Sequence, residues 1–163
     1  MALRYVLALG SNAPHHRHGP PARVLDAAVA ALEKEGMKVR AVSRWRQSAP
    51  LGPSRRRYAN GVVLVKSKLD PAALLDRVKR IEAHFGRRTG GQPWSSRVLD
   101  IDLVLWSGGA WYSPGLVVPH PAWRDRDFVL EPVAEIAPQW RDPLTGLTAR
   151  HLLHRLRKAA SRP

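Results

Sequence analysis

The chain contains no cysteine among its 163 residues. This absence excludes disulfide bonds, thiolate catalysis and cysteine-bound zinc, and it fits a cytoplasmic protein, since disulfides are rare in that compartment. Long apolar runs are also missing, because none approaches the roughly 20 residues that cross a bilayer. The first residues lack the basic and apolar segments of a secretory signal. We therefore expect a cytoplasmic protein without a membrane-spanning segment.

Acidic residues are scarce: 13 Asp and Glu stand against 27 Lys and Arg, a formal net charge of +14. A field of that sign attracts polyanions, so nucleic acid, a phosphorylated metabolite and an anionic membrane are all candidate partners. Arginine dominates the basic set, and its guanidinium suits bidentate phosphate contacts better than a lysine ammonium does. A GC-rich genome would produce the same enrichment without any functional cause.

The remaining composition is that of an ordinary globular domain. Hydrophobic residues make up 44% of the chain and charged residues 25%, both close to globular averages. The length suffices for one hydrophobic core. We see no repeats and no linker, so we expect a single domain over residues 1–163.

Hydrophobic periodicity and turn residues predict the order βαββαβ, followed by a tail. Asp70 and Pro71 are typical of a helix start, as N-cap and first-turn residue. The predicted elements are a strand over 3–9, a helix over 22–35, strands over 39–47 and 58–66, a helix over 71–85, a strand over 97–105, a hairpin strand within 111–118, and helices near 121–126, 131–136 and 148–159. This order predicts an α/β (α+β) ferredoxin-like core, a mainly antiparallel sheet with helices packed on one face, and a C-terminal helical extension.

Two acids lie in a stretch that otherwise has the pattern of a buried strand, Asp100 and Asp102. Strand side chains alternate between faces, so both acids point the same way, while Leu99, Ile101, Leu103 and Leu105 can close on a core. Neighbouring carboxylates repel unless a positive charge lies between them. Mg²⁺ takes carboxylate oxygens, usually with phosphate oxygens completing its shell. The alternative is an exposed strand face with two solvated acids, and the pair alone does not decide.

A second unusual segment holds three histidines, His15, His16 and His18. They would suit a metal ion, but no acid or cysteine stands near them in the sequence. A flexible basic loop is the interpretation that the composition favours.

Several motifs together match one known family in order and spacing. They are Leu9-Gly10-Ser11-Asn12, Pro50-Leu51-Gly52-Pro53, Tyr58-Ala59-Asn60, Arg80-Ile81-Glu82, Arg97-Val98-Leu99-Asp100-Ile101-Asp102, Val118-Pro119-His120, Arg126 and Phe128. From residue 3 to about 157 the chain resembles the 6-hydroxymethyl-7,8-dihydropterin pyrophosphokinases of folate biosynthesis. The resemblance implies transfer of the pyrophosphoryl group of ATP to the pterin hydroxymethyl oxygen, with release of AMP. Such a transfer depends on in-line positioning and on neutralised phosphate oxygens.

The resemblance implies catalytic roles for Asp100, Asp102, Arg97 and Arg87, with the two aspartates binding two Mg²⁺ ions. It implies that ATP is bound by Arg87, Trp94, Arg97, His120, Arg126 and Glu82. Other interpretations stay open for these side chains considered singly. Arg97 could form an ion pair with the acids, His120 could be a turn residue, Arg87 a surface charge and Trp94 a hydrophobic anchor.

The resemblance also implies a pterin site made by Tyr58, Asn60, Phe128 and the segment Ala49, Pro50 and Leu51. Two rings can stack on a flat heterocycle, and an amide can both donate to it and accept from it. Tyr58 and Asn60 are two residues apart and so share a strand face. Without the motif they would be taken as a core tyrosine and a strand-entry asparagine.

The segment before the acidic strand departs from the family pattern. Ser95 and Ser96 stand where Gly-Pro is usual, Pro93 where many members carry arginine, and Thr89 where a basic residue is common. We hypothesise that Arg88, Arg55, Arg56 or Arg57 supplies the missing phosphate contacts. The expected partners are ATP and the pterin, for a monomer that binds no nucleic acid and no membrane. The alternatives are a basic RNA-binding module and a relative that binds pterin without turnover.

Overall fold

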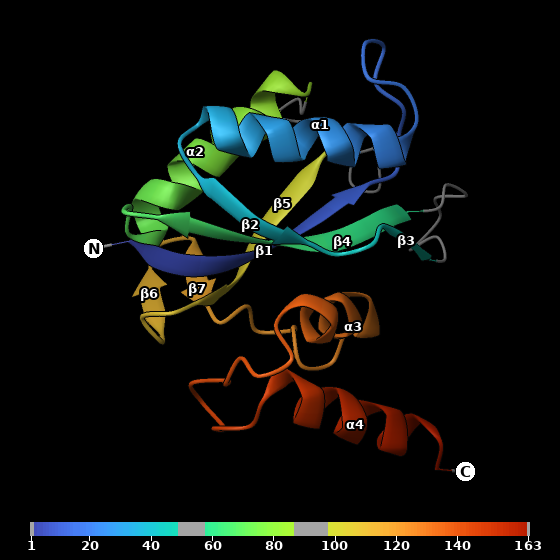
Figure 1. The fold of residues 1–163 in the computed structure, drawn as a ribbon, viewed down its shortest axis with the longest axis vertical. Helices are drawn as coiled ribbons and strands as arrows, with labels where there is room; N and C mark the ends of the chain where they lie inside the picture. The colour runs from blue at the N-terminus through green and yellow to red at the C-terminus, as the bar shows by residue number, and fades with distance from the viewer. Residues whose placement is uncertain (1, 49–57, 87–97, 163) are drawn as a thin grey trace.

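The computed structural model describes residues 2–48, 58–86 and 98–162. Its elements in chain order are β1 (Leu3–Ser11), α1 (Pro21–Lys34), β2 (Lys38–Val42), β3 (Arg46–Ser48), β4 (Tyr58–Ser67), α2 (Pro71–His84), β5 (Asp100–Trp106), β6 (Trp111–Ser113), β7 (Leu116–Val118), α3 (Asp127–Ile136) and α4 (Ala149–Ala160). Figure 1 shows a sheet with helices above and below it.

The main sheet has the strand order β2-β4-β1-β5, with β3 paired to β4 beyond the end of β2. All of these pairings are antiparallel. Counting β2 and β3 as one strand, the order along the sheet is fourth, first, third, second. This is the ferredoxin-like arrangement, so the predicted fold class is confirmed.

The strand predicted over 39–47 is interrupted between β2 and β3. Ser43 bonds to β4 at the break: its backbone N–H donates to the carbonyl of Val62 and its hydroxyl accepts from the N–H of Val62. Trp45 then packs on Gly61, where an added Cβ would meet the indole at 2.4 Å. Only glycine leaves room for this ring, and the break shifts the start of β3 to Arg46.

Two layers of helix enclose the sheet (Figure 1). Helices α1 and α2 cover one face, as expected for the core. Helix α3 lies against the opposite face and α4 packs on α3, so the C-terminal extension provides a second layer. The helices predicted near 121–126 and 131–136 are instead turns at 121–125 followed by α3, which continues through Pro132.

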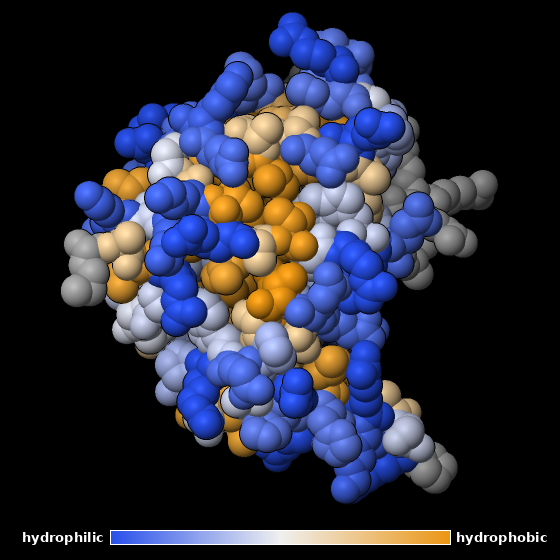
Figure 2. Space-filling view, in the orientation of Figure 1, coloured by the Kyte–Doolittle hydropathy of each residue, from blue (hydrophilic) through white to orange (hydrophobic). Residues whose placement is uncertain are grey.

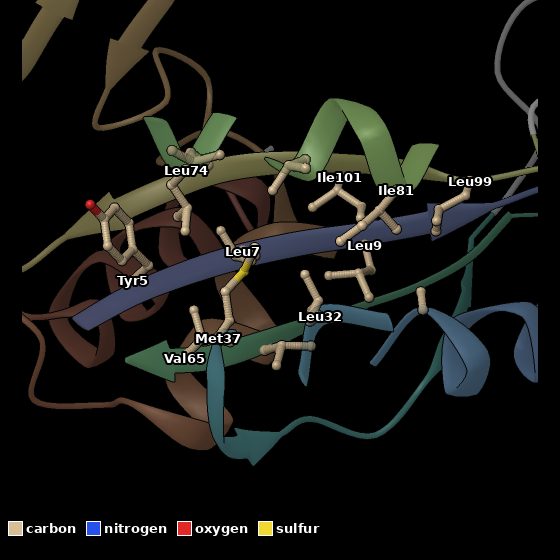
Figure 3. Packing of buried hydrophobic residues seen from close by; sticks show 14 of the residues in the cluster. Tyr5, Leu7, Leu9, Leu32, Met37, Val65, Leu74, Ile81, Leu99 and Ile101 are labelled. Atoms are coloured by element: carbon tan, nitrogen blue, oxygen red, sulfur yellow. The ribbon is translucent and has the colours of Figure 1, made fainter. Parts of the chain in front are cut away.

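The core under α1 and α2 is built from alternate residues of the central strands. Figure 3 shows Leu7 and Leu9 of β1 packed with Ile101 of β5 and Ile81 of α2. Asp70 caps α2 as predicted, because its carboxylate accepts from the N–H of Ala73 at 2.9 Å. This packing fixes α2 against β5.

A second core lies between the sheet and the C-terminal helices. It contains Val6, Val104, Leu105, Trp123 and Leu130. The expectation that Leu105 shares a face with Leu103 was wrong. The β1–β5 register shifts between Val6 and Leu7, so that one extra residue of β5 bulges and the alternation changes side.

The surface is mostly polar, in keeping with the composition. Figure 2 shows hydrophilic side chains over most of the visible face, with a hydrophobic stretch across the middle. Within the described residues, every helix falls short of the length and apolar character needed to cross a membrane.

Candidate functional site

A cavity of about 740 Å³ opens between the sheet and the beginning of α3. Its floor comes from the sheet face opposite α1 and α2, and its wall from residues 126–131. The lining side chains include most of the described residues that the sequence singled out: Tyr58, Asn60, Asp100, Asp102, His120, Arg126 and Phe128. The structure therefore brings these candidates together, although they come from distant parts of the chain.

Strand register places four cavity residues in one row across the sheet. Arg46 of β3 pairs with Asn60 of β4, Asn60 pairs with Gly10 of β1, and Gly10 pairs with Asp100 of β5. Residues paired across neighbouring strands present their side chains to the same face. The row thus runs from a cationic end at Arg46 to an acidic end at Asp100.

Gly10 leaves the middle of this row open. A Cβ built at this position would lie 3.3 Å from the side-chain oxygen of Asn60 and 4.0 Å from Tyr58 Cδ1. Any side chain would therefore crowd the asparagine and fill the floor of the cavity. The glycine of the motif Leu9-Gly10-Ser11-Asn12 therefore keeps the floor of the cavity open beside Asn60.

The acidic pair lies at the β5 end of the cavity. Asp100 is half-buried and Asp102 is exposed, while Ile101 between them is buried in the core under α2. The predicted alternation is confirmed for this stretch. Among the described residues no group of three or more metal-ligating side chains is gathered. Two carboxylates on one wall suit a hard cation whose remaining ligands are water and phosphate oxygens.

Glu82 is placed behind the acidic pair rather than in the main cavity. The residue is only 6% exposed, and its carboxylate accepts a hydrogen bond from the N–H of Ile101 at 2.8 Å. It also lines a smaller hollow beside Lys79, Asp102 and His120. The position gives Glu82 a structural contact to the backbone between the two aspartates.

His120 lies beside Asp102 and is anchored through its backbone and ring. Its N–H donates to the carbonyl of Val104 at 2.9 Å, and its Nδ1 accepts from the N–H of Ala122 at 3.1 Å. Burial is the largest cause that lowers the pKa of the imidazole; Asp102 raises the pKa and Arg126 lowers it. The neutral ring therefore carries its proton on Nε2, which remains available as a donor.

The aromatic and cationic residues of the α3 wall lie close together. The Arg126 guanidinium carbon is 5.7 Å from the centre of the Phe128 ring. Arg126 is the N-cap residue of α3, and Asp127 accepts from the N–H of Phe128 at 2.8 Å. Tyr58, on β4, lines the same cavity as Phe128.

Several predicted site residues lie outside the described part of the chain. They are Ala49, Pro50, Leu51, Arg87, Trp94 and Arg97. The residues that depart from the family pattern, at 89, 93, 95 and 96, and the arginines that could replace the missing phosphate contacts, at 55–57 and 88, also lie outside it. Their roles stay predictions.

Sequence reasoning missed the cavity residues Arg46, Gln47, Asp127 and Glu131. Arg46 was assigned to a strand, but its place opposite Asn60 depends on the pairing of β3 with β4. No motif marks that register. Asp127 and Glu131 lie on either side of Phe128 along α3, and one helical turn separates them.

The histidine loop lies at the end of α2. His15 stacks on His16 and His18, with ring centres 4.3 and 4.7 Å apart, and His18 stacks on Phe85 at 5.2 Å. His15 Nδ1 accepts from the backbone N–H groups of Arg17 and His18. The rings thus pack the β1–α1 connection onto the last turn of α2.

Comparison with known proteins adds an independent finding. Residues 6–138 match the family model described as 7,8-dihydro-6-hydroxymethylpterin-pyrophosphokinase. The matched region covers every described element of the cavity.

Several individual relatives carry the name 2-amino-4-hydroxy-6-hydroxymethyldihydropteridine pyrophosphokinase. The protein of a Synechocystis species is 37% identical over 152 residues, which are 93% of this chain and 75% of the relative. The Pseudomonas aeruginosa protein is 37% identical over 88% of this chain and 86% of its own length. The Methylorubrum extorquens protein is 36% identical over 94% of this chain and 93% of its own length.

Solved structures support the fold. The HPPK-DHPS protein of Plasmodium falciparum, solved with STZ-DHP, matches 95% of this chain with a TM-score of 0.75 and 13% identity. The structure with pteroate matches 95% with a TM-score of 0.73 and 12% identity. This chain spans 43% and 44% of those longer chains.

Proposed function

Because this chain belongs to the 7,8-dihydro-6-hydroxymethylpterin pyrophosphokinase family, we propose that Asp100 and Asp102 hold the metal ions of the family reaction. The enzyme is an ATP-dependent transferase that moves the pyrophosphoryl group of ATP to 6-hydroxymethyl-7,8-dihydropterin. The supporting observation is that both carboxylates line the cavity that also holds Tyr58, Asn60 and Phe128. Family membership replaces the interpretation as an RNA-binding module.

Two Mg²⁺ ions at this pair would neutralise phosphate oxygens and lower the pKa of the attacking hydroxyl. The chain's own contribution is positional. The hydrogen bond from the Ile101 N–H to Glu82 fixes the backbone between Asp100 and Asp102. The carboxylate oxygens of both aspartates therefore stay on one wall of the cavity. The pair then needs no reorganisation when charge develops on the transferred group.

We propose that the pterin occupies the β4 and α3 side of the cavity. Tyr58 and Phe128 supply two aromatic faces. Asn60, a residue that is 9% exposed, supplies an amide and lies in the row with Asp100. A ring bound there directs its hydroxymethyl group along the row toward the acidic end. The segment 49–51 would complete this half of the site.

The triphosphate belongs, in this proposal, beside His120 and Arg126. The Nε2–H of His120 can donate to a phosphate oxygen, and Arg126 adds a positive charge on the α3 wall. Arg87, Trp94 and Arg97 complete the ATP site on the strength of the sequence motif. Glu82 contributes by holding the backbone of β5.

We further propose a cytoplasmic monomer that consists of one pyrophosphokinase domain over 1–163 and takes only small-molecule substrates. The absence of cysteine and the small-molecule cavity support this part of the proposal. ATP and the pterin account for the residues that line the cavity, so this proposal includes no binding of nucleic acid or membrane.

The central test is AMP release from ATP and 6-hydroxymethyl-7,8-dihydropterin, with and without Mg²⁺. We expect AMP formation that requires Mg²⁺ and falls at least about 100-fold in Asp100→Asn and in Asp102→Asn, since removal of one charge-stabilising group commonly costs that much. Asp76→Asn, at an exposed position of α2, is the matched control and should keep full activity.

Two results would contradict the assignment. If both aspartate variants stay active, the metal site is elsewhere. If wild-type enzyme binds pterin but releases no AMP, the chain is a binding relative without turnover.

A further inference from the structure

We propose that Arg46 is a pterin-binding residue whose guanidinium donates a hydrogen bond to an acceptor atom on the pyrimidine ring of the substrate. The inference rests on the proposed placement of the pterin between Tyr58 and Phe128. It assigns a recognition role to a residue that no sequence motif marks. Four observations carry it.

The first observation is position. Arg46 pairs directly with Asn60, and the row continues through Gly10 to Asp100. Three strand spacings of about 4.8 Å put the two ends of the row roughly 14 Å apart. A pterin whose hydroxymethyl group reaches the acidic end therefore points its pyrimidine ring toward Arg46.

The second observation is that carboxylates hold the guanidinium in place. Arg46 Nη2 lies 2.7 Å from Glu135 Oε1, and its Nε lies 4.0 Å from Glu131 Oε2. Both glutamates come from α3, which also carries Phe128. The arginine is thus oriented by the same helix that supplies one face of the pterin site.

The third observation is an unused donor. Arg46 Nη1 is buried and makes no hydrogen bond within the described residues, although Arg46 lines the cavity. A buried N–H group without an acceptor is unfavourable, and a ligand oxygen or nitrogen that arrives beside it removes that cost. The guanidinium is therefore prepared for an acceptor from the substrate.

The fourth observation is chemical complementarity. The pyrimidine ring of a pterin carries a carbonyl oxygen and a ring nitrogen that accept hydrogen bonds. A guanidinium only donates, whereas the neighbouring Asn60 amide can do both. A charge-assisted bond from Arg46 would add affinity and favour an oxo-substituted heterocycle.

Arg44 offers a control for a merely structural role. It contacts the same Glu135, through its backbone N–H at 2.9 Å and its Nε at 3.5 Å. Its side chain is 81% exposed, and it lines the neighbouring groove but not the pterin cavity. The two arginines thus share a partner and differ in access to the substrate.

The experiment compares Arg46→Met with Arg44→Met in the full chain. Pterin affinity is measured by equilibrium binding without ATP, KM by AMP release for both substrates, and stability by thermal unfolding. We expect Arg46→Met to weaken pterin binding about 10- to 100-fold, the range for a lost hydrogen bond to a charged group. KM for ATP should stay within about twofold, and Arg44→Met should change neither quantity.

The controls separate the possible failures. Should Arg46→Met not fold, Arg46→Lys, which keeps a donor and a charge, must show a pterin affinity below wild type with ATP binding unchanged. Unaltered pterin affinity in a folded Arg46 variant overturns the inference, as does an equal loss in Arg44→Met. A wild-type enzyme that binds pterin without releasing AMP would contradict the proposed function while leaving the Arg46 contact intact.

Discussion

At the scale of the residue, the cavity depends on what one position lacks. Gly10 lies between Asn60 and Asp100 in the row across the sheet. Because glycine has no side chain, the floor of the cavity is open at this position and a substrate can lie across it. Because Gly10 leaves this space open, one substrate molecule could contact both the acidic end and the arginine end of the row.

Gly10→Ala tests the gap. The new methyl would lie 3.3 Å from the Asn60 oxygen, so the amide must shift and part of the cavity floor proposed for the pterin is filled. We expect KM for the pterin to rise several-fold while KM for ATP and the melting temperature change little, because overpacking at a cavity wall can relax into the cavity. Steady-state kinetics with each substrate varied in turn will check this, and an unchanged pterin KM would place the pterin elsewhere.

At the scale of the element, α3 links the site to the C-terminal layer. It carries Phe128 to the cavity and Glu135 to Arg46, and it packs on α4 in the second core. The connections before and after α3 are held together by Arg124, whose guanidinium contacts both oxygens of Asp142 at 2.5 and 2.6 Å.

This pair predicts a specific pH effect. Burial alone would raise the pKa of the Asp142 carboxyl, but hydrogen bonds from Arg124, Thr145 and the Leu144 N–H lower it. A lowered folded-state pKa stabilises the fold above the unfolded value of about 3.9 and loses that contribution as pH falls below it.

Arg124→Met should therefore destabilise the protein by about 3–5 kcal/mol at pH 7, because it leaves a buried carboxylate without its partner. The loss should shrink toward pH 4, where the unpaired acid can take up a proton. Denaturant unfolding at both pH values is the measurement. Arg157→Met is the control, since that exposed pair with Glu131 should contribute less than about 1 kcal/mol. Equal effects of the two variants would contradict the assignment.

At the scale of the whole molecule, the net charge of +14 has a use for an enzyme whose substrate is a polyphosphate. A positive field raises the local concentration of ATP, whereas the uncharged pterin does not sense it. The acidic pair lies inside this field, so that ATP in the cavity would meet both signs of charge.

The KM values of the two substrates should depend differently on salt. Raising ionic strength from about 0.1 M to about 1 M shortens the Debye length from roughly 10 to 3 Å. We expect KM for ATP to rise several-fold over this range while KM for the pterin stays nearly constant. AMP release at a series of NaCl concentrations will measure both, and a parallel rise of the two constants would show a general effect of salt on the fold instead.

Local patterns predicted a large part of this molecule. Side-chain alternation in β5 was enough to place Asp100 and Asp102 on one face, and the Asp70-Pro71 pair was enough to start α2. These inferences succeed because they depend on neighbours in the chain, whose geometry follows from one strand or one helical turn.

By itself, the sequence determined the βαββαβ order of the core, the acidic pair and the family motifs. Only the tertiary structure decided which strands bring Arg46 opposite Asn60, that a bulge turns Leu105 to the second core, and that α3 forms a wall of the cavity on the sheet face opposite α1 and α2. The physical reason is register. Residues distant in sequence meet according to how whole strands pair and how side chains fill the space between layers, and that packing is collective.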